Sequence, residues 1–184
     1  MNEELWLQKV RRWLDVMVVG ENLCPFAEKP LNAGKVRIAV CLEDDPEAVY
    51  RAFLLELERL LNLGEDALET TLLACPNALG DFYDYLDLLA LLEGAISELE
   101  LDGVLQIASF HPEYEFEGAG KDDPANYTNR SPCPLFHLLR ESSISEAVSQ
   151  LAQPERIPQR NAQHMRALGV EKIHRLLDEI ADQD

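Results

Sequence analysis

The stretch "KVRIAVCLEDDPEAVYRAFLLELERLLNLGEDALETTLLACP", residues 35–76, decides the fold. Residues 35–42 alternate in polarity and are rich in β-branched side chains, which is typical of a strand. Pro46 suits the first turn of a helix, and the apolar spacing continues to Gly64, a residue type that commonly follows a helix end. Residues 69–76 form a second apolar run of strand length. A strand, a helix of this length and another strand predict a right-handed crossover between parallel strands.

The segments on either side extend this pattern. Toward the amino end, apolar residues recur at helical spacing over residues 3–19, with Gly20 in the position after the helix end, and a loop with two prolines follows. Beyond the crossover, residues 81–101 predict a long helix with acids in its first turn, and "GVLQIASF", residues 103–110, predicts a third strand. Further helices are predicted at 134–141, 143–151, 158–169 and 170–180, the last two separated at Gly169.

This order of elements predicts the fold class. We expect an α/β fold with a small three- or four-stranded parallel or mixed sheet, crossover helices and a helical C-terminal segment. Three strands make a narrow sheet, so a fourth is expected in a loop, around residues 113–117. At 184 residues the chain is expected to form a single α/β domain, 1–184, on which residues 153–184 pack as a helical extension.

Composition excludes several classes of partner. With 47% hydrophobic and 27% charged residues the chain is typical of soluble globular proteins. Its net charge of −18 repels phosphate backbones and anionic lipids, so neither nucleic acid nor a membrane is an expected partner. An alternative is that the surplus acids merely keep helix faces solvated. No apolar stretch approaches the roughly 18 residues of a membrane helix. The amino end does not resemble a secretory signal, so a cytoplasmic location with reduced cysteines is expected.

The candidate site begins at "SFHPEYEFEG", residues 109–118, where the third strand ends. In open sheets built from crossover units, ligands bind outside the carboxyl ends of the strands. His111 follows the third strand directly, and the long polar loop 121–132 is expected to cover the same crevice. Within that loop "NYTNRSP", residues 126–132, offers amides, hydroxyls and one guanidinium, which suit a carboxylate or phosphate group.

The expected ligand-binding residues are Asn22, Asn126, Tyr127, Asn129, Arg130, Ser131 and His137. The alternative interpretation is that the loop residues cap the following helix and satisfy loop backbone, because Asn and Ser are favoured in turns and caps. Arg130 is the residue that this alternative explains least. The expected ligand is a small anionic molecule.

Cys24 and His111 are the candidate catalytic residues. Cys24 lies in "NLCPF", just after the first helix, and would act as a nucleophile or redox thiol. Such a thiol needs a lowered pKa, which the imidazole of His111 or the guanidinium of Arg130 would supply. The alternative is that Cys24 packs as a small apolar residue and that His111 only bonds the backbone.

A metal site is the third possibility that the residue pattern leaves open. Cys133 and His137 are four residues apart at a predicted helix start, on adjacent turns of one face, and His111 would add a second imidazole. The alternative is that Pro134 begins the helix and that Cys133 is only its cap-position residue. No residue is assigned to a metal on this basis, and no cofactor is indicated.

Four motifs resemble a known family: "NLCPFA", "ETTLL", "LQIASFHPEYEF" and "DDPANYTNRSPCPLFHLLRE". The chain is similar, over nearly its whole length, to bacterial proteins grouped as domain of unknown function 1415. The resemblance implies a bacterial, cytoplasmic, single-domain protein and carries over no catalytic residue. In that pattern the slot of Cys133 is usually aromatic, which weakens a metal site that needs its thiol. The matching signature positions are Asn22, Cys24, Pro25, Phe26, His111, Pro112, Asn126, Tyr127, Asn129, Arg130, Ser131, Pro132 and His137.

Three functional hypotheses follow. The first is a thiol- and histidine-based enzyme acting on a small anionic molecule at the strand ends. The second is a non-catalytic module that binds a metabolite or a protein through the same loop. The third is a metal-binding protein that uses His111 and His137. The oligomeric state and the reaction class stay open.

Overall fold

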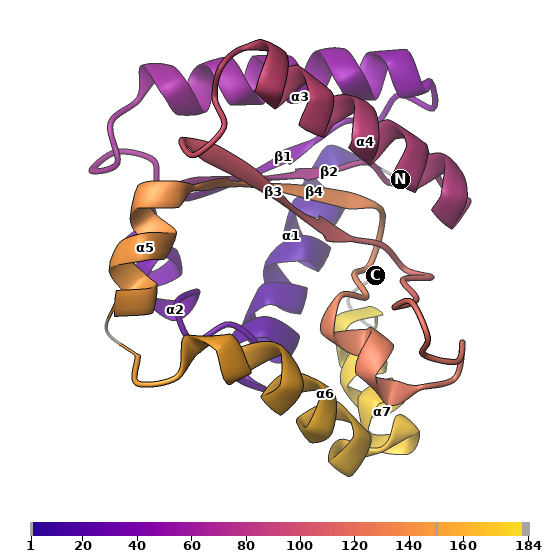
Figure 1. Ribbon diagram of the computed structural model, residues 1–184. Helices are drawn as coiled ribbons and strands as arrows, with labels where there is room; N and C mark the ends of the chain where they lie inside the picture. Colours follow the sequence, from indigo (N-terminus) through magenta and orange to yellow (C-terminus); the bar gives the residue numbers. More distant parts are fainter. Residues whose placement is uncertain (1, 150, 182–184) are drawn as a thin grey trace.

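The computed structural model describes residues 2–149 and 151–181 and contains one four-stranded mixed sheet (Figure 1). The strands are β1 (Val36–Val40), β2 (Thr70–Ala74), β3 (Leu105–Phe110) and β4 (Leu135–Arg140), in the order β1-β2-β4-β3. β1 and β2 are parallel, and β4 is antiparallel to both of its neighbours. β1, β2 and β3 therefore point the same way, and their carboxyl ends lie at the edge where β4 begins. The predicted α/β class with a mixed sheet is confirmed.

The identity of the fourth strand differs from the prediction. Residues 134–141 do not form the predicted helix, because residues 135–140 form β4. The prediction of a strand at residues 113–117 is also wrong, because these residues form turn and loop. Phe136 and Leu138 point to one face of the sheet and Leu135 to the other, and all three are buried. A central strand that is buried on both faces has a continuous apolar run, which cannot be told from a short buried helix by periodicity.

Two crossover helices cover one face of the sheet (Figure 1). They are α3 (Pro46–Asn62) and α4 (Phe82–Glu98), each started by an aspartate whose side chain accepts from backbone N–H groups of the first turn. Asp45 caps α3 and Asp81 caps α4. Phe53, Leu57 and Leu92 pack from these helices onto the sheet. The predicted strand–helix–strand crossover is present, since α3 connects the parallel strands β1 and β2.

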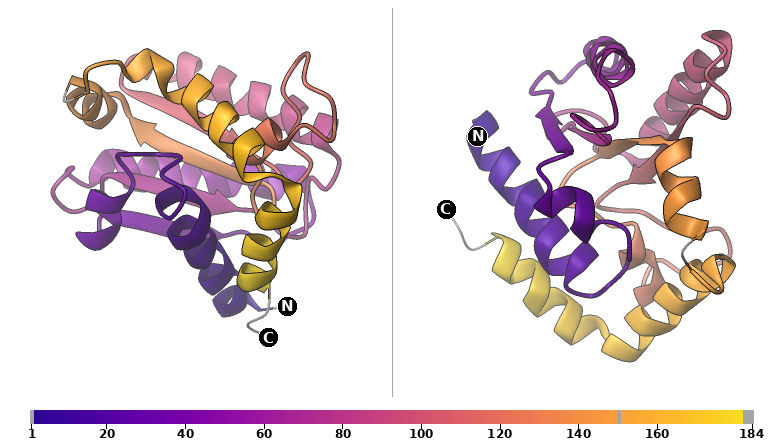
Figure 2. Two further views of the ribbon diagram at one scale, coloured as in Figure 1. Left: turned by 90° about the horizontal axis from the view of Figure 1, so that it is seen from below. Right: turned by 90° about the vertical axis from the view of Figure 1, so that its left-hand side faces the viewer.

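The other face is covered by the amino-terminal helix (Figure 2). α1 (Glu3–Trp13) continues into a π-helix, η1 (Leu14–Val19), so the predicted helix 3–19 is present with a wider second half. Gly20 has φ −59°, so it is not the left-handed residue expected after a helix. A Cβ atom there would lie 2.3 Å from the carbonyl oxygen of Val16, and this close approach is the reason for a glycine.

The remaining helices complete that second layer. A short helix, α2 (Glu28–Asn32), precedes β1, and α5 (Glu141–Ser149) continues from β4. After the 3-10 helix η3 (Pro154–Arg156), α6 (Ile157–Leu168) and α7 (Val170–Ala181) are separated at Gly169, whose φ is +79°. Met165, Ile173 and Ile180 from α6 and α7 are buried against the α1 face of the sheet, so the helical C-terminal segment predicted from the sequence is present. Within residues 2–149 and 151–181, no helix has the length and apolar character needed to span a membrane.

Candidate functional site

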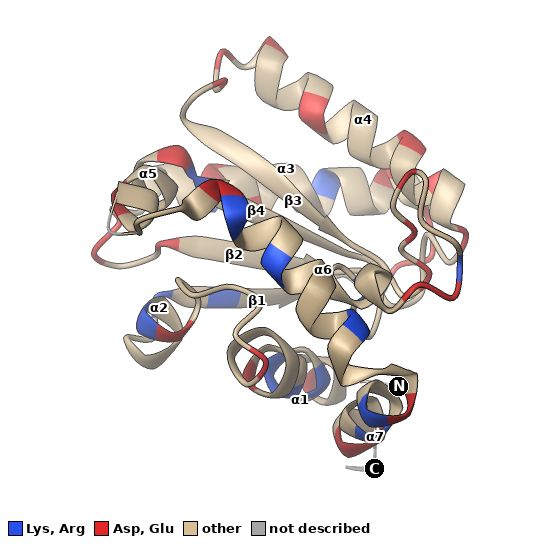
Figure 3. Ribbon diagram, turned by 60° about the horizontal axis from the view of Figure 1, so that its bottom comes forward, with Lys and Arg blue, Asp and Glu red and all other residues tan. Residues whose placement is uncertain are grey.

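A hollow of about 630 Å³ lies beside the carboxyl end of β3, where three distant parts of the chain meet. One wall comes from the end of η1 and the loop after it, the second from Phe110 and the loop between β3 and β4, and the third from α6. Figure 3 shows α6 lying across the molecule on this side. Its lining residues are Val18, Leu23, Cys24, Phe110, Phe116, Glu117, Gly118, Ala119, Ala125, Thr128, Asn129, Ile157, Pro158, Gln159, Asn161, Ala162 and Arg166. Its size is within the range of small-molecule sites.

The lining is mostly apolar with a few polar groups. Val18, Leu23 and Phe110 contribute hydrocarbon surface, and Arg166 and Glu117 are the charged side chains among the lining residues. Arg166 is already paired: its Nε and Nη2 atoms donate to the carboxylate of Asp123 over 2.9 and 2.6 Å. This pair lowers the pKa of Asp123 to about 2.

Cys24 lines the hollow and is the one partly accessible cysteine, because Cys41, Cys75 and Cys133 are buried. Burial raises the pKa of the Cys24 thiol above its ordinary value. Hydrogen bonds from the backbone of Phe26 and Ala27, and the positive charge of Arg160, act in the opposite direction but do not outweigh burial. The thiol is therefore protonated at neutral pH.

The structure does not bring His111 to Cys24. Phe110 points toward α1, with its ring centroid 5.3 Å from that of Trp13, and His111 points to the opposite face. There its imidazole lies 5.2 Å from the ring of Phe82 and 5.1 Å from that of Tyr85, both on α4. Cys24 packs on the α1 face. The thiol and the imidazole are thus on opposite sides of the sheet, and no Cys24–His111 pair forms.

Both ring nitrogens of His111 are engaged with backbone. Nδ1 accepts from the N–H of Glu113 over 3.0 Å, so Nε2 carries the proton and donates to the carbonyl of Leu79 over 2.9 Å. The side chain is fully buried, and burial lowers the pKa of His111. These contacts match the alternative in which His111 bonds the backbone.

Asn126 stabilises the loop between β3 and β4, which forms the second wall of the hollow. Its side-chain oxygen accepts from the N–H of Phe116 over 3.1 Å, and its amide donates to the carbonyls of Gly120 and Lys121 over 2.9 and 3.3 Å. It lies in the 3-10 helix η2 (Pro124–Thr128) and is fully buried. Because all of its hydrogen-bonding groups have protein partners, it shapes the hollow rather than lining it.

Arg130 is also engaged within the loop. Its Nε donates to the carbonyl of Tyr114 over 3.2 Å and its Nη2 to that of Lys121 over 2.9 Å. The guanidinium lies 4.5 Å from the ring centroid of Tyr127, a cation–π contact. The residue that capping explained least therefore binds loop carbonyls and an aromatic ring.

Among the other expected ligand-binding residues, one lines the hollow and three do not. Asn129 lines the hollow, and its side-chain amide donates to Ser109 over 3.0 Å. Ser131 is buried and donates to the carbonyl of Cys133 over 2.7 Å. Tyr127 meets His174 of α7, with 3.0 Å between its hydroxyl and Nε2. Asn22 is exposed, with φ +51°. Of the nominated residues, Cys24 and Asn129 line the hollow.

The residues considered for a metal do not lie on one helix, because residues 135–140 form the strand β4. His137 lies within that strand, its Nε2 2.7 Å from the hydroxyl of Thr70, and burial lowers its pKa to about 4. Cys133 is buried before the strand, and burial raises its pKa to about 12. The two are not on adjacent turns of a helix. Within the described ranges, no group of three or more His, Cys, Asp or Glu side chains is placed to hold a metal ion.

Sequence reasoning missed the contribution of α6. Arg160 donates from Nη2 to the carbonyl of Asn22 over 2.5 Å and to the side chain of Asn161 over 2.8 Å, and Asn161 donates to the carbonyl of Leu23 over 2.6 Å. These bonds attach α6 to the loop that carries Cys24. The available signal was charge, because residues 156–170 contain three arginines and no acid in a strongly acidic chain.

Comparison with known proteins identifies the family. The family model described as "Protein of unknown function (DUF1415)" matches residues 6–175 of the 184-residue chain. The chain belongs to this family. The match confirms the resemblance seen in the sequence motifs. No curated protein and no solved structure matches the chain.

Proposed function

We propose that this member of the DUF1415 family binds a small molecule with an apolar body and one anionic group in the hollow beside Cys24. The observation that carries the proposal is the convergence of η1, the β3–β4 loop and α6 on one hollow of about 630 Å³. Hollows of this size with apolar walls and a few polar groups are the usual form of small-molecule sites.

The charges of α6 support an anionic group. Arg160 lies near enough to Cys24 to act on the pKa of its thiol, and its guanidinium donates to neutral partners, the carbonyl of Asn22 and the side chain of Asn161. Arg166 is also part of the lining, but the carboxylate of Asp123 already balances its charge. Asn129, Thr128 and Asn161 add neutral polar side chains to the same lining. In a chain of net charge −18, an anion is bound most favourably where arginines are concentrated.

Binding without catalysis is the form of the proposal that the geometry favours. The Cys24 thiol has a raised pKa, and the imidazole that would activate it lies across the sheet. A thiol enzyme is the second candidate, because the backbone of Phe26 and Ala27 and the charge of Arg160 would stabilise a thiolate if a ligand changed the surroundings of Cys24. The first candidate predicts saturable binding with no turnover.

The test is calorimetric titration of straight-chain carboxylates of six to ten carbons, each against the alcohol of equal length. We expect the carboxylates to bind more tightly than the alcohols. Ala162→Phe, which places a ring into the lining, should abolish binding, whereas Ala167→Phe on the exposed side of α6 should not. No saturable heat with any of these compounds, or unchanged binding by Ala162→Phe, would contradict the proposal.

A further inference from the structure

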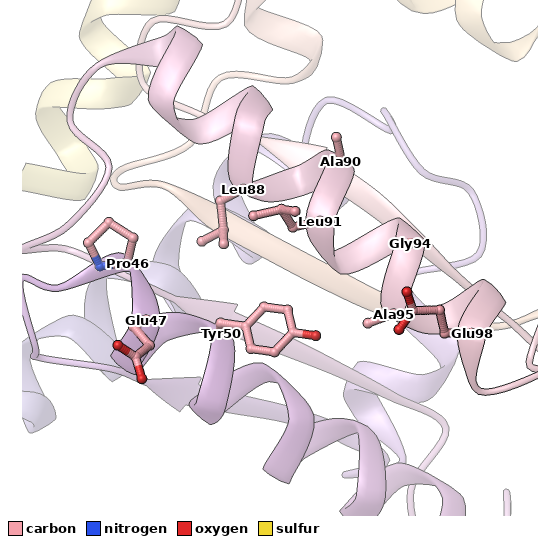
Figure 4. Close-up of a pocket in the computed structure, with 9 residues that line it drawn as sticks. All are labelled: Pro46, Glu47, Tyr50, Leu88, Ala90, Leu91, Gly94, Ala95 and Glu98. Carbon is pink, nitrogen blue, oxygen red and sulfur yellow. The ribbon is translucent and has the colours of Figure 1, made fainter.

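A second hollow, of about 510 Å³, lies on the opposite layer of the molecule, between α3 and α4 (Figure 4). Its walls are Pro46, Glu47 and Tyr50 of α3 and Leu88, Ala90, Leu91, Gly94, Ala95 and Glu98 of α4. Figure 4 shows Tyr50 extending from α3 into the space between the two helices. This groove, defined by these nine residues, has no part in the hollow beside Cys24.

The groove presents apolar surface to solvent. Leu91 is 63% exposed at its margin, although Leu88 and Ala95 beneath it are buried. Gly94 is in the interior of α4, where glycine weakens a helix, and a Cβ atom there would meet nothing within 4 Å. Packing within the chain therefore does not require a glycine at this position, and its missing side chain leaves the groove open.

The charge on the α4 side of the groove has one sign. Residues 60–110 contain no Lys, Arg or His, and α4 carries only acidic charges (Figure 3). On α3, Arg51 pairs with Glu47 over 2.7 Å, which leaves Glu98 as a groove acid without an ion pair in the described structure. The acids of this segment are Glu65, Asp66, Glu69, Asp81, Asp84, Asp87, Glu93, Glu98, Glu100 and Asp102.

We propose that the groove between α3 and α4 is a docking site for a basic amphipathic helix of a partner protein. An apolar helical stripe would fill the space over Leu88, Gly94 and Ala95, and flanking Lys or Arg side chains would meet the acids of α4. A second copy of the chain is disfavoured as the occupant, because two chains that each carry a net charge of −18 repel each other.

The test uses a fluorescein-labelled peptide, LKKLLKLLKKLLKL, and its counterpart with glutamate in place of lysine. Fluorescence anisotropy at physiological salt should show saturable one-to-one binding of the lysine peptide and none of the glutamate peptide. Leu91→Ser, which removes groove surface, and Gly94→Leu, which fills the groove, should each weaken binding at least tenfold. Leu55→Ser is the matched control: Leu55 is also 63% exposed but lies outside the groove, and binding should change less than twofold.

Four results would overturn the proposal. They are the absence of saturable binding, equal binding of the glutamate peptide, equal effects of Leu91→Ser and Leu55→Ser, and self-association of the wild-type chain that Leu91→Ser abolishes. The last result would make a second copy the occupant. If Gly94→Leu fails to fold, Leu91→Ser still decides, since the side chain that it replaces is mostly exposed.

Discussion

The imidazole of His111 donates a hydrogen bond from Nε2 to the carbonyl oxygen of Leu79 over 2.9 Å. Leu79 has φ +59°, an uncommon conformation for a branched residue, in the turn between β2 and α4. His111 follows β3 directly, so this hydrogen bond connects the carboxyl ends of β2 and β3. A residue nominated from the sequence as catalytic thus joins two strand ends.

Replacing His111 should therefore cost stability. His111→Ala leaves the Leu79 carbonyl and the Glu113 N–H without their partners and opens a cavity beside Phe82. We expect a loss of about 3 kcal/mol in the free energy of unfolding, measured by urea denaturation. His164→Ala, at an exposed site on α6, should change it by less than about 1 kcal/mol. Equal effects of the two substitutions would contradict the structural role.

Desolvation of the half-buried His137 imidazole predicts a pH dependence of stability. Its pKa is lowered to about 4 in the fold, against about 6.5 in an unfolded chain. Between these values the unfolded chain binds a proton that the folded chain lacks. The stability that depends on a neutral His137 is therefore fully present above pH 6.5 and is lost as the pH falls toward 4.

The comparison of wild type with His137→Gln isolates this effect from the acidic residues. The stability advantage of the wild type over the variant should shrink between pH 7 and pH 5, by up to about 1.4 kcal/mol per pH unit. Urea denaturation at several pH values measures it. An advantage that is constant over this range would show that His137 titrates normally in the fold.

Gly20 and Gly94 should respond to alanine with opposite signs. At Gly20 the new Cβ would lie 2.3 Å from the Val16 carbonyl oxygen, so Gly20→Ala should destabilise the fold by about 2 kcal/mol. At Gly94 nothing lies within 4 Å, so Gly94→Ala should gain about 0.5–1 kcal/mol from helix propensity. Thermal unfolding of both variants checks the signs, and a shift of the same sign in both would contradict this account.

Cys24 should be the first thiol to react in the folded protein. It is the partly accessible cysteine, and its raised pKa means that alkylation should accelerate only above the ordinary thiol range. Mass spectrometry after iodoacetamide treatment should show one adduct in native protein, absent from Cys24→Ser, and four in denaturant. A Cys24 rate that is already at its plateau at pH 7 would favour the thiol-enzyme candidate.

Local pattern was sufficient for most of the elements. The pattern of residues 36–40 and 70–74 predicts strands, because both are short, β-branched runs bounded by turn residues. Pro46 indicates the start of the helix between these two strands, and Asp81 indicates the start of the helix that follows the second strand. Residues 135–140 did not read as a strand, because Phe136 and Leu138 are buried on one face and Leu135 on the other. The period that distinguishes the two structures is lost when both faces are covered.

The candidate site was also predicted only in part from the sequence. Two of the residues nominated from the sequence, Cys24 and Asn129, do line one hollow. The sequence did not reveal that His111 faces α4 while Phe110 faces α1, because a shift of one residue at a strand end reverses the face. It also did not reveal α6 as the third wall, because the Arg160 and Asn161 contacts span 138 positions of the chain.

The amino-acid sequence by itself determined the α/β class, the crossover, the acidic surface and the family, since each rests on composition or on patterns within a few turns of chain. Tertiary structure alone decided that β4 inserts between β2 and β3, and that thiol and imidazole lie on opposite sides of the sheet. The physical reason is that strand pairing and the burial of each face are set by contacts between segments far apart in sequence, whose free energy no local pattern contains.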